Sequence, residues 1–272
     1  MRIAEPVLAS WKAELALEFE RRGERTVLAA RRHEGPLAVQ KPLYPEGDAV
    51  CHAIVVHPPA GIAGGDELEI RATVGDDSHA VLTTPGAGKW YRSAGVWARQ
   101  RLSFRVEGIL EWLPQQTIVF DAALADMGCA VDLAPQARFI GWEILCLGRS
   151  GSGERFARGA CRVTSEIRRA GRLLWLERGR LEGGGALLES PAGLGGKSVC
   201  ATILAAGEFE AGLVTACRTV RKLGVTLLPG VLVARYLGDS SEEARRCLAR
   251  VWSVLRPALC GREAIEPRIW QT

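Results

Sequence analysis

Apolar and polar side chains alternate with a period of two residues through much of the first two thirds of this chain. In residues 13–20 the apolar side chains fall on odd positions, and residues 68–74 and 102–106 repeat the alternation. A β-strand with one buried and one solvated face has this period. Turn residues such as Gly75-Asp76-Asp77 separate the runs, with no helical crossover of roughly 10–15 residues between them. The pattern predicts a mainly β fold of layered, mainly antiparallel sheets and argues against a doubly wound α/β fold.

A different period appears in the C-terminal third. Residues 244–255 follow the i, i+3, i+4, i+7 spacing of an amphipathic helix. Ser240 and Glu243 form a capping box at its start, and Pro257 is predicted to end it. A weaker pattern of the same kind runs from about 208 to 223. We therefore expect about two helices here, and we expect the apolar stripe of the stronger one to contact a partner, leaving the isolated chain poorly soluble.

Composition and charge exclude several classes of protein. The 272 residues include 35 Lys and Arg against 31 Asp and Glu, and this net charge of +4 is too small for a dedicated nucleic-acid binder. No apolar run approaches the roughly 20 residues that span a bilayer, and the first ten residues lack a signal-peptide core. The eight cysteines contain no Cys-x-x-Cys pair, which favours buried free thiols. We expect a cytoplasmic protein without nucleic-acid or membrane partners.

No linker or internal repeat divides the sequence, so a single β-rich domain over residues 1–272 is expected.

Two glycine–lysine pairs resemble the end of a nucleotide-binding P-loop. The first glycine that this motif requires is replaced by Thr83 in one case and by Pro191 in the other. No histidine follows His79, which excludes the Ser, Asp, His order of α/β-hydrolases. We therefore expect neither a nucleotide site nor histidine acid–base catalysis.

The segment from His57 to Asp66 contains two prolines and three glycines between two predicted strands. These residues fix an unusual backbone path that brings His57 and Asp66 to the two mouths of one loop. An imidazole and a carboxylate are suitable ligands for nickel or zinc. A structural loop with a solvated aspartate explains the segment equally well.

Two carboxylates lie on apolar faces of predicted strands. Glu143 shares its predicted face with Leu145, and Glu177 shares its face with Leu173 and Trp175. Such a carboxylate costs several kcal/mol unless it is paired, hydrated or metal-bound. An arginine partner is the simple explanation, because arginine is plentiful nearby. The alternative is an internal polar passage whose walls carry Asp66, Glu69, Glu143 and Glu177.

Several longer segments follow one another in an order that is typical of one known family, and they cover nearly the whole chain. They are Gln40–Gly47, Val56–Asp66, Thr83–Ser93, Leu110–Asp121, Phe139–Glu143, Leu147–Arg149, Arg235–Gly238 and Pro267–Trp270. On these segments the chain resembles the UreD family of urease accessory proteins, called UreH in some systems.

The resemblance implies a mainly β maturation factor that is not an enzyme. Members of this family bind the urease apoprotein and recruit UreF and, through UreF, the GTPase UreG, so that nickel reaches the urease active site. Nickel is then in transit, no tightly bound cofactor is implied, and a homodimer within the accessory complex is compatible with the role. The family is thought to carry nickel through an internal acidic tunnel. The residues of this chain that map onto such a tunnel are Asp66, Glu69, Glu143 and Glu177, and His57 is a further candidate metal ligand.

The sequence leaves two other functions open. A metal-dependent hydrolase built on His57 and the nearby carboxylates would turn over a substrate alone, whereas a maturation scaffold acts only with apo-urease, nickel and its partners. A plain β interaction module is the third reading. It predicts that replacing the carboxylates leaves nickel incorporation unchanged.

Overall fold

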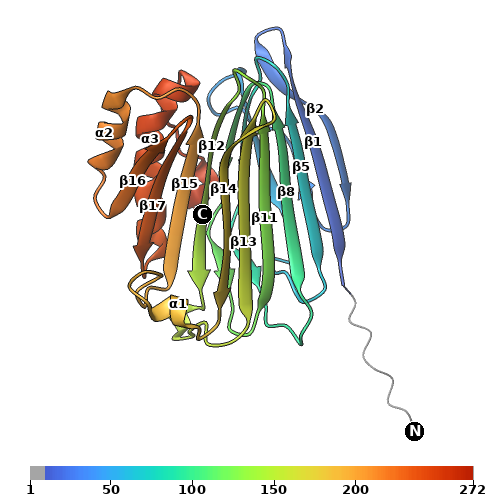
Figure 1. Cartoon of the computed structure of the whole chain (residues 1–272). Helices are drawn as coiled ribbons and strands as arrows, with labels where there is room; N and C mark the ends of the chain where they lie inside the picture. Colours follow the sequence, from blue (N-terminus) through green and yellow to red (C-terminus); the bar gives the residue numbers. More distant parts are fainter. Residues whose placement is uncertain (1–9, 272) are drawn as a thin grey trace.

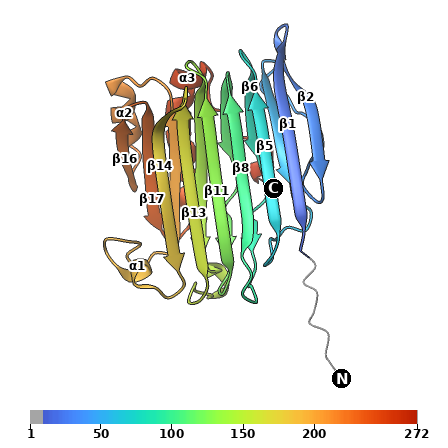
Figure 2. The same ribbon diagram turned by 45° about the vertical axis from the view of Figure 1, so that its right-hand side comes forward.

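The protein consists of two facing β-sheets, with helices on the outer side of one of them (Figure 1). The computed structural model describes residues 10–271. Within these residues one sheet has seven strands, and Figure 2 shows it with no helix in front of its central strands. From edge to edge it contains β14 (Arg172–Glu182), β13 (Ala160–Arg169), β11 (Leu124–Leu133), β8 (Ala98–Val106), β5 (Glu67–Val74), β1 (Lys12–Arg22) and β2 (Arg25–Glu34).

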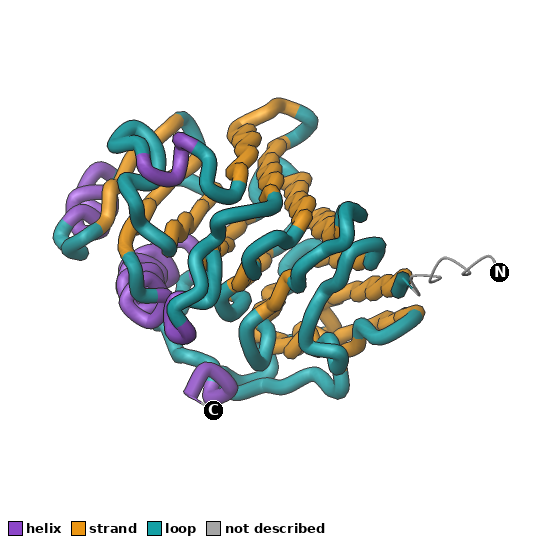
Figure 3. Tube along the Cα trace, turned by 90° about the horizontal axis from the view of Figure 1, so that it is seen from below, coloured by secondary structure: helices purple, strands orange, loops and turns teal. Residues whose placement is uncertain are grey.

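The other sheet has ten strands within the described residues and carries the helices. Helices α2 (Ala211–Arg218) and α3 (Ser241–Cys260) gather on one side of the strands, as Figure 3 shows from below. The short α1 (Ala186–Glu189) was not predicted from the sequence. The main path of the sheet is β16 (Leu223–Leu228), β17 (Val231–Gly238), β15 (Val199–Ala206), β12 (Arg138–Leu147), β9 (Ile109–Leu113), β6 (His79–Thr83), β4 (Val50–Val56) and β3 (Ala38–Val39), while β10 (Thr117–Val119) pairs with β12 and β7 (Gly88–Trp90).

Through the middle of the chain, the strands alternate between the two sheets. β5, β8, β11 and β13 enter one sheet, while β6, β9 and β12 enter the other. Neighbours within a sheet therefore run in the same direction, and the pairs β5–β8, β8–β11, β11–β13, β6–β9 and β9–β12 are parallel.

The mainly β prediction is confirmed, but the expectation of mainly antiparallel pairing is wrong for these central strands. Antiparallel pairs occur toward the flanks, for example β1–β2, β13–β14 and β15–β17. Parallel strands need a crossover connection, and a helix is its usual form. Here a strand of the opposite sheet makes the crossover, so a chain without helical crossovers still forms parallel pairs.

The two-residue period correctly predicts which side chains enter the core. Leu15 and Leu17 of β1 and Leu68 and Ile70 of β5 are buried in one cluster. β12 is buried on both faces, because its odd side chains join that cluster while even ones such as Trp142 pack with α3. Double burial of this kind is typical of strands that are covered on both faces.

Helix α3 begins as the sequence predicts and ends later. Ser240 Oγ accepts a hydrogen bond from the backbone N–H of Glu243 at 3.1 Å, which confirms the predicted cap. The prediction that Pro257 ends the helix is wrong, since the helix continues to Cys260 and stops at Gly261, whose φ is 67°. Proline removes one backbone hydrogen bond from the helix. Burial of the following turn, which includes Cys260, offsets that loss.

The apolar stripe of α3 belongs to the protein's own core. Its buried side chains pack against the ten-stranded sheet, so the expectation that this stripe contacts a partner is wrong. Helix α2 is shorter than the predicted span of residues 208–223, because β16 already begins at Leu223. No helix in residues 10–271 combines the length and the apolar composition needed to cross a lipid bilayer.

Candidate functional site

A cavity of about 720 Å³ lies between the inner faces of the two sheets. Most side chains in its wall are apolar, and the ionisable ones include His57, Glu143 and Glu177. These three predicted site residues thus share one internal space. Asp66 and Glu69 do not line it, so the prediction that all four carboxylates face a common passage is wrong for these two.

Glu143 is an unpartnered carboxylate in the middle of β12. The odd register of the strand turns it toward the opposite sheet with Phe139 and Leu145, as the sequence predicts. Among the described residues, none donates a hydrogen bond to its carboxylate. Burial raises the pKa of Glu143 to about 7, and the negative charge of Glu177 adds to the shift. The carboxyl therefore gains and loses its proton far more readily near neutral pH than an exposed glutamate does, and a bound cation would favour the ionised form.

Glu177 approaches from the other sheet, on β14. Its Oε1 accepts a hydrogen bond from Nη2 of Arg235 on β17 at 2.7 Å, so it has the arginine partner that Glu143 lacks. Glu177 lies on the inner face with Trp175, as predicted, but Leu173 is exposed. A register shift in the β13–β14 pair explains the difference, because it interrupts the two-residue alternation before Trp175.

Buried thiols from both sheets lie near Glu143, Cys129 on β11 and Cys200 on β15. Burial raises the pKa of both Cys129 and Cys200 to about 12, with a further contribution from the charge of Glu143. These thiols therefore stay protonated at neutral pH, and the thiolate is the form that binds a metal. Near Glu143, the negative charge in the cavity wall is therefore carried by carboxylates and not by thiolates.

His57 follows β4 and lines the same cavity. Burial lowers the pKa of its imidazole, and the charge of Asp66 opposes that shift without cancelling it. The ring is therefore mostly neutral at pH 7, which leaves a nitrogen lone pair available for a metal ion.

Asp66 has a structural role in the glycine-rich loop. Its side chain accepts hydrogen bonds from the backbone N–H of Ala63 at 2.7 Å and of Trp11 at 2.9 Å. The residue is only 3% exposed, so the expectation of a solvated aspartate is also wrong. Gly65 has a φ of 95°, a conformation that favours glycine. Both carboxylate oxygens of Asp66 therefore accept backbone hydrogen bonds that hold the loop, and the residue does not belong to the predicted metal path.

Glu69 lies on the outer face of the seven-stranded sheet, where it forms an ion pair with Arg71. Its neighbours Leu68 and Ile70 point inward and line the cavity. The two-residue period of this strand already places Glu69 on the opposite face from these leucine and isoleucine side chains. That local signal contradicts the position taken from the family resemblance.

Replacing Asp66 by alanine should lower the free energy of unfolding by about 1–3 kcal/mol, because the backbone N–H groups of Ala63 and Trp11 lose the buried acceptor that holds the loop. Urea denaturation of the purified chain measures this loss. The control is Glu69→Ala on the sheet surface, which should change stability by about 0.5 kcal/mol or less. Equal stabilities for the two variants would show that the aspartate does not hold the loop.

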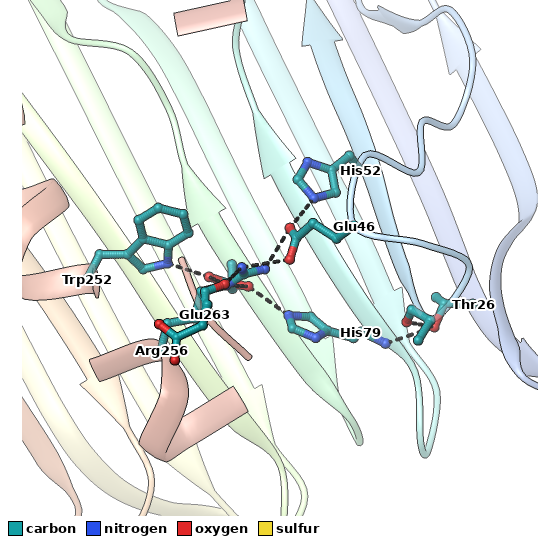
Figure 4. A network of polar contacts seen from close by, with 9 residues as sticks. Thr26, Glu46, His52, His79, Trp252, Arg256 and Glu263 are labelled. Carbon is teal, nitrogen blue, oxygen red and sulfur yellow. Dashed lines mark hydrogen bonds and ion pairs between the residues drawn. The ribbon is translucent and has the colours of Figure 1, made fainter. Parts of the chain in front are cut away.

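A buried ionic network was missed by sequence analysis. Glu111 is fully buried and accepts hydrogen bonds from Trp252 Nε1 and, at 2.9 Å, from Arg256 Nε, while His79 Nε2 lies 2.7 Å from its carboxylate (Figure 4). Burial acts to raise the pKa of Glu111, but the hydrogen bond and charge of His79 and the charge of Arg256 outweigh it and lower the pKa. The sequence did contain a signal, because Glu111 interrupts an apolar strand and Arg256 lies one turn after Trp252.

The same arginine holds a second carboxylate. Arg256 donates to both oxygens of Glu46, at 2.7 and 2.8 Å, and His52 Nε2 lies 2.6 Å from Glu46 Oε1 (Figure 4). Burial opposes ionisation of Glu46, but hydrogen bonds from His52 and Arg256 lower its pKa to about 2. The network therefore joins α3 to the sheet and to the loop before β4.

One part of this network has the composition of a metal site. His79, Glu111 and Cys260 bring one ligand atom each to within 4.8 Å of one another, the only such group in the described part of the chain. The carboxylate of Glu111 already accepts a hydrogen bond from Arg256. Burial raises the pKa of Cys260 well above its usual value, so the thiol is protonated. We interpret the group as structural.

The fold and the cavity define a mainly β protein in which two mixed sheets enclose a carboxylate-bearing space. Its sequence matches the family described as UreD urease accessory protein over residues 12–271. The chain therefore belongs to the UreD family of urease accessory proteins, and its role is that of a urease accessory protein.

Individual relatives agree with this assignment. The urease accessory protein UreD of Azoarcus sp. (strain BH72) is 57% identical over 269 residues, which cover 96% of this chain and 94% of the relative. The protein of the same name from Dechloromonas aromatica (strain RCB) is 57% identical over 274 residues, or 97% and 95% of the two chains. UreD of Nitrosococcus oceani is 50% identical over 269 residues, covering 97% and 91%.

Proposed function

We propose that this protein is a non-catalytic scaffold for urease maturation and that nickel passes through the cavity between its sheets. It holds the urease apoprotein and UreF, and it reaches the GTPase UreG through UreF, in the cytoplasm. Nickel is the cargo, and the protein needs no tightly bound cofactor. The observation that carries the proposal is Glu143, a carboxylate on the wall of an internal cavity to which no group in residues 10–271 donates a hydrogen bond.

Weak binding is the property that a passage requires, because an ion must leave each site as readily as it enters. Glu143 and Glu177 supply oxygen ligands from opposite sheets, and His57 supplies a nitrogen elsewhere on the wall. These three do not form a group with ligand atoms within 4.8 Å of one another among residues 10–271. Such separated ligands support binding steps in series.

The same separation weighs against the metal-dependent hydrolase. A catalytic metal site usually has about three convergent protein ligands and an open position for water or substrate. His57, Glu143 and Glu177 do not converge in this way, and the His79, Glu111 and Cys260 group is closed by Arg256. The scaffold is therefore the better supported function.

We expect the double variant Glu143→Gln/Glu177→Gln to lower the nickel content of matured urease severalfold, because glutamine keeps the shape of both side chains and removes their charge. Metal analysis and urease activity, after coexpression with the urease subunits and the other accessory proteins, provide the measurement. Glu69→Gln is the matched control, since Glu69 lies outside the cavity. Fully nickel-loaded urease from the double variant would show that the ions travel elsewhere.

The partners are tested separately from the metal path. The wild-type chain and the Glu143→Gln/Glu177→Gln variant should both copurify with the urease subunits, UreF and UreG, because both side chains line the cavity and glutamine keeps their shape. The mass of the purified complex then shows whether it contains a homodimer of this chain. Loss of copurification in the variant would mean that its nickel defect reports assembly and not transport.

A further inference from the structure

A cation of the protein already lies beside the carboxylates of the cavity. Arg235 of β17 pairs with Thr202 of β15, and Thr202 in turn pairs with Glu143 of β12. Directly paired residues of neighbouring strands point to the same side of a sheet. The three side chains therefore form one row on the inner face of the ten-stranded sheet. Glu177 meets this row from the opposite sheet and binds Arg235.

The ion pair between Arg235 and Glu177 is weak enough to be displaced. One guanidinium nitrogen contacts one carboxylate oxygen, and the side chains are 48% and 36% exposed. Pairs with this exposure contribute little stability, and the contact lacks the two parallel hydrogen bonds of a strong arginine–carboxylate pair. The ring of Trp175 lies 5.7 Å from the guanidinium carbon, within the range of a cation–π contact. Arg235 thus has a second favourable contact when it leaves Glu177.

We propose that Arg235 is the internal counter-cation of the cavity: it occupies Glu177 when no metal ion is present, and a divalent cation must displace it to bind Glu143 and Glu177 together. This inference rests on the proposed function. Arginine remains charged at every accessible pH, so it competes with the metal under all conditions. The competition lowers the affinity of the carboxylates for the ion and returns the site to a neutralised state after release.

Binding of Ni²⁺ to the purified full-length chain tests the proposal, with NiSO₄ as the titrant in calorimetry. Arg235→Gln should bind Ni²⁺ about tenfold more tightly than the wild type, the effect expected when one unit charge is removed from the surroundings of a divalent ion. Arg235→Lys keeps the charge and should stay within about twofold of the wild type. The gain should disappear in Arg235→Gln/Glu143→Gln/Glu177→Gln. Thermal unfolding curves verify that each variant is folded.

The failures of the two proposals are distinguishable. If Arg235→Gln binds Ni²⁺ no more tightly than the wild type while Glu143→Gln/Glu177→Gln binds it more weakly, the counter-cation is wrong and the carboxylate path stands. If the double glutamine variant binds Ni²⁺ as the wild type does, or if neither the wild type nor Arg235→Gln binds it, both proposals fail.

Discussion

Replacing Arg256 by methionine is expected to lower the free energy of unfolding by about 3–5 kcal/mol, the range found when one partner of a buried ion pair is removed. The guanidinium is fully buried and is shared by Glu46 and Glu111. Its loss leaves two buried carboxylates without their common cation. Urea denaturation at pH 7 measures the change. Arg250→Met on the exposed face of α3 is the matched control and should cost about 0.5 kcal/mol or less.

The triple variant Glu46→Gln/Glu111→Gln/Arg256→Met separates charge from packing. If uncompensated charge causes the loss, removing both carboxylates should recover part of the stability that Arg256→Met loses. A triple variant that is less stable than Arg256→Met would show that the hydrogen bonds of the glutamates, and not their unpaired charges, dominate the network.

Glu143→Gln should change stability in the opposite direction and in a pH-dependent way. The folded protein raises the pKa of Glu143 from 4.5 to about 7, so the folded state holds this proton more tightly than the unfolded state does. Stability is therefore lost as the pH rises from about 4.5 to 7. Above that range the glutamine variant should be more stable than the wild type by up to about 3 kcal/mol, and below it the two should converge.

The groups that face Glu143 support this assignment. They are Glu177 on β14, which adds to the pKa shift, and the protonated thiols of Cys129, Cys161 and Cys200, which carry no charge to oppose it. Denaturation curves between pH 4.5 and 8 provide the measurement, with Glu69→Gln as a surface control. A stability difference that stays constant across this range would assign the effect to packing instead of ionisation. A more stable variant that delivers less nickel would show a function maintained at the expense of stability.

Local pattern predicted much of the fold and part of the site. The two-residue period gave the strands and their buried faces, and it turned Glu143 inward correctly, because alternation depends only on neighbouring residues. It could not give the pairing of the strands, since no local signal states which sheet a strand enters. Asp66 was misassigned for a similar reason, because its role depends on the backbone of Trp11, which is 55 positions away. Glu46 and Arg256 are 210 positions apart, and no spacing rule connects them.

The alternation of strands between the sheets has a consequence for how the chain folds. Each pass through both sheets is one winding of a coil, and neighbouring windings meet at modest distances along the chain: Glu67 contacts Arg99, 32 positions later, and Arg101 contacts Asp126, 25 positions later. Short separations of this kind favour fast folding. The coil can therefore be wound progressively, as in a repeat protein. Arg256 of α3 then ties the end of the coil to Glu46, which precedes β4 and so comes before these windings in the chain.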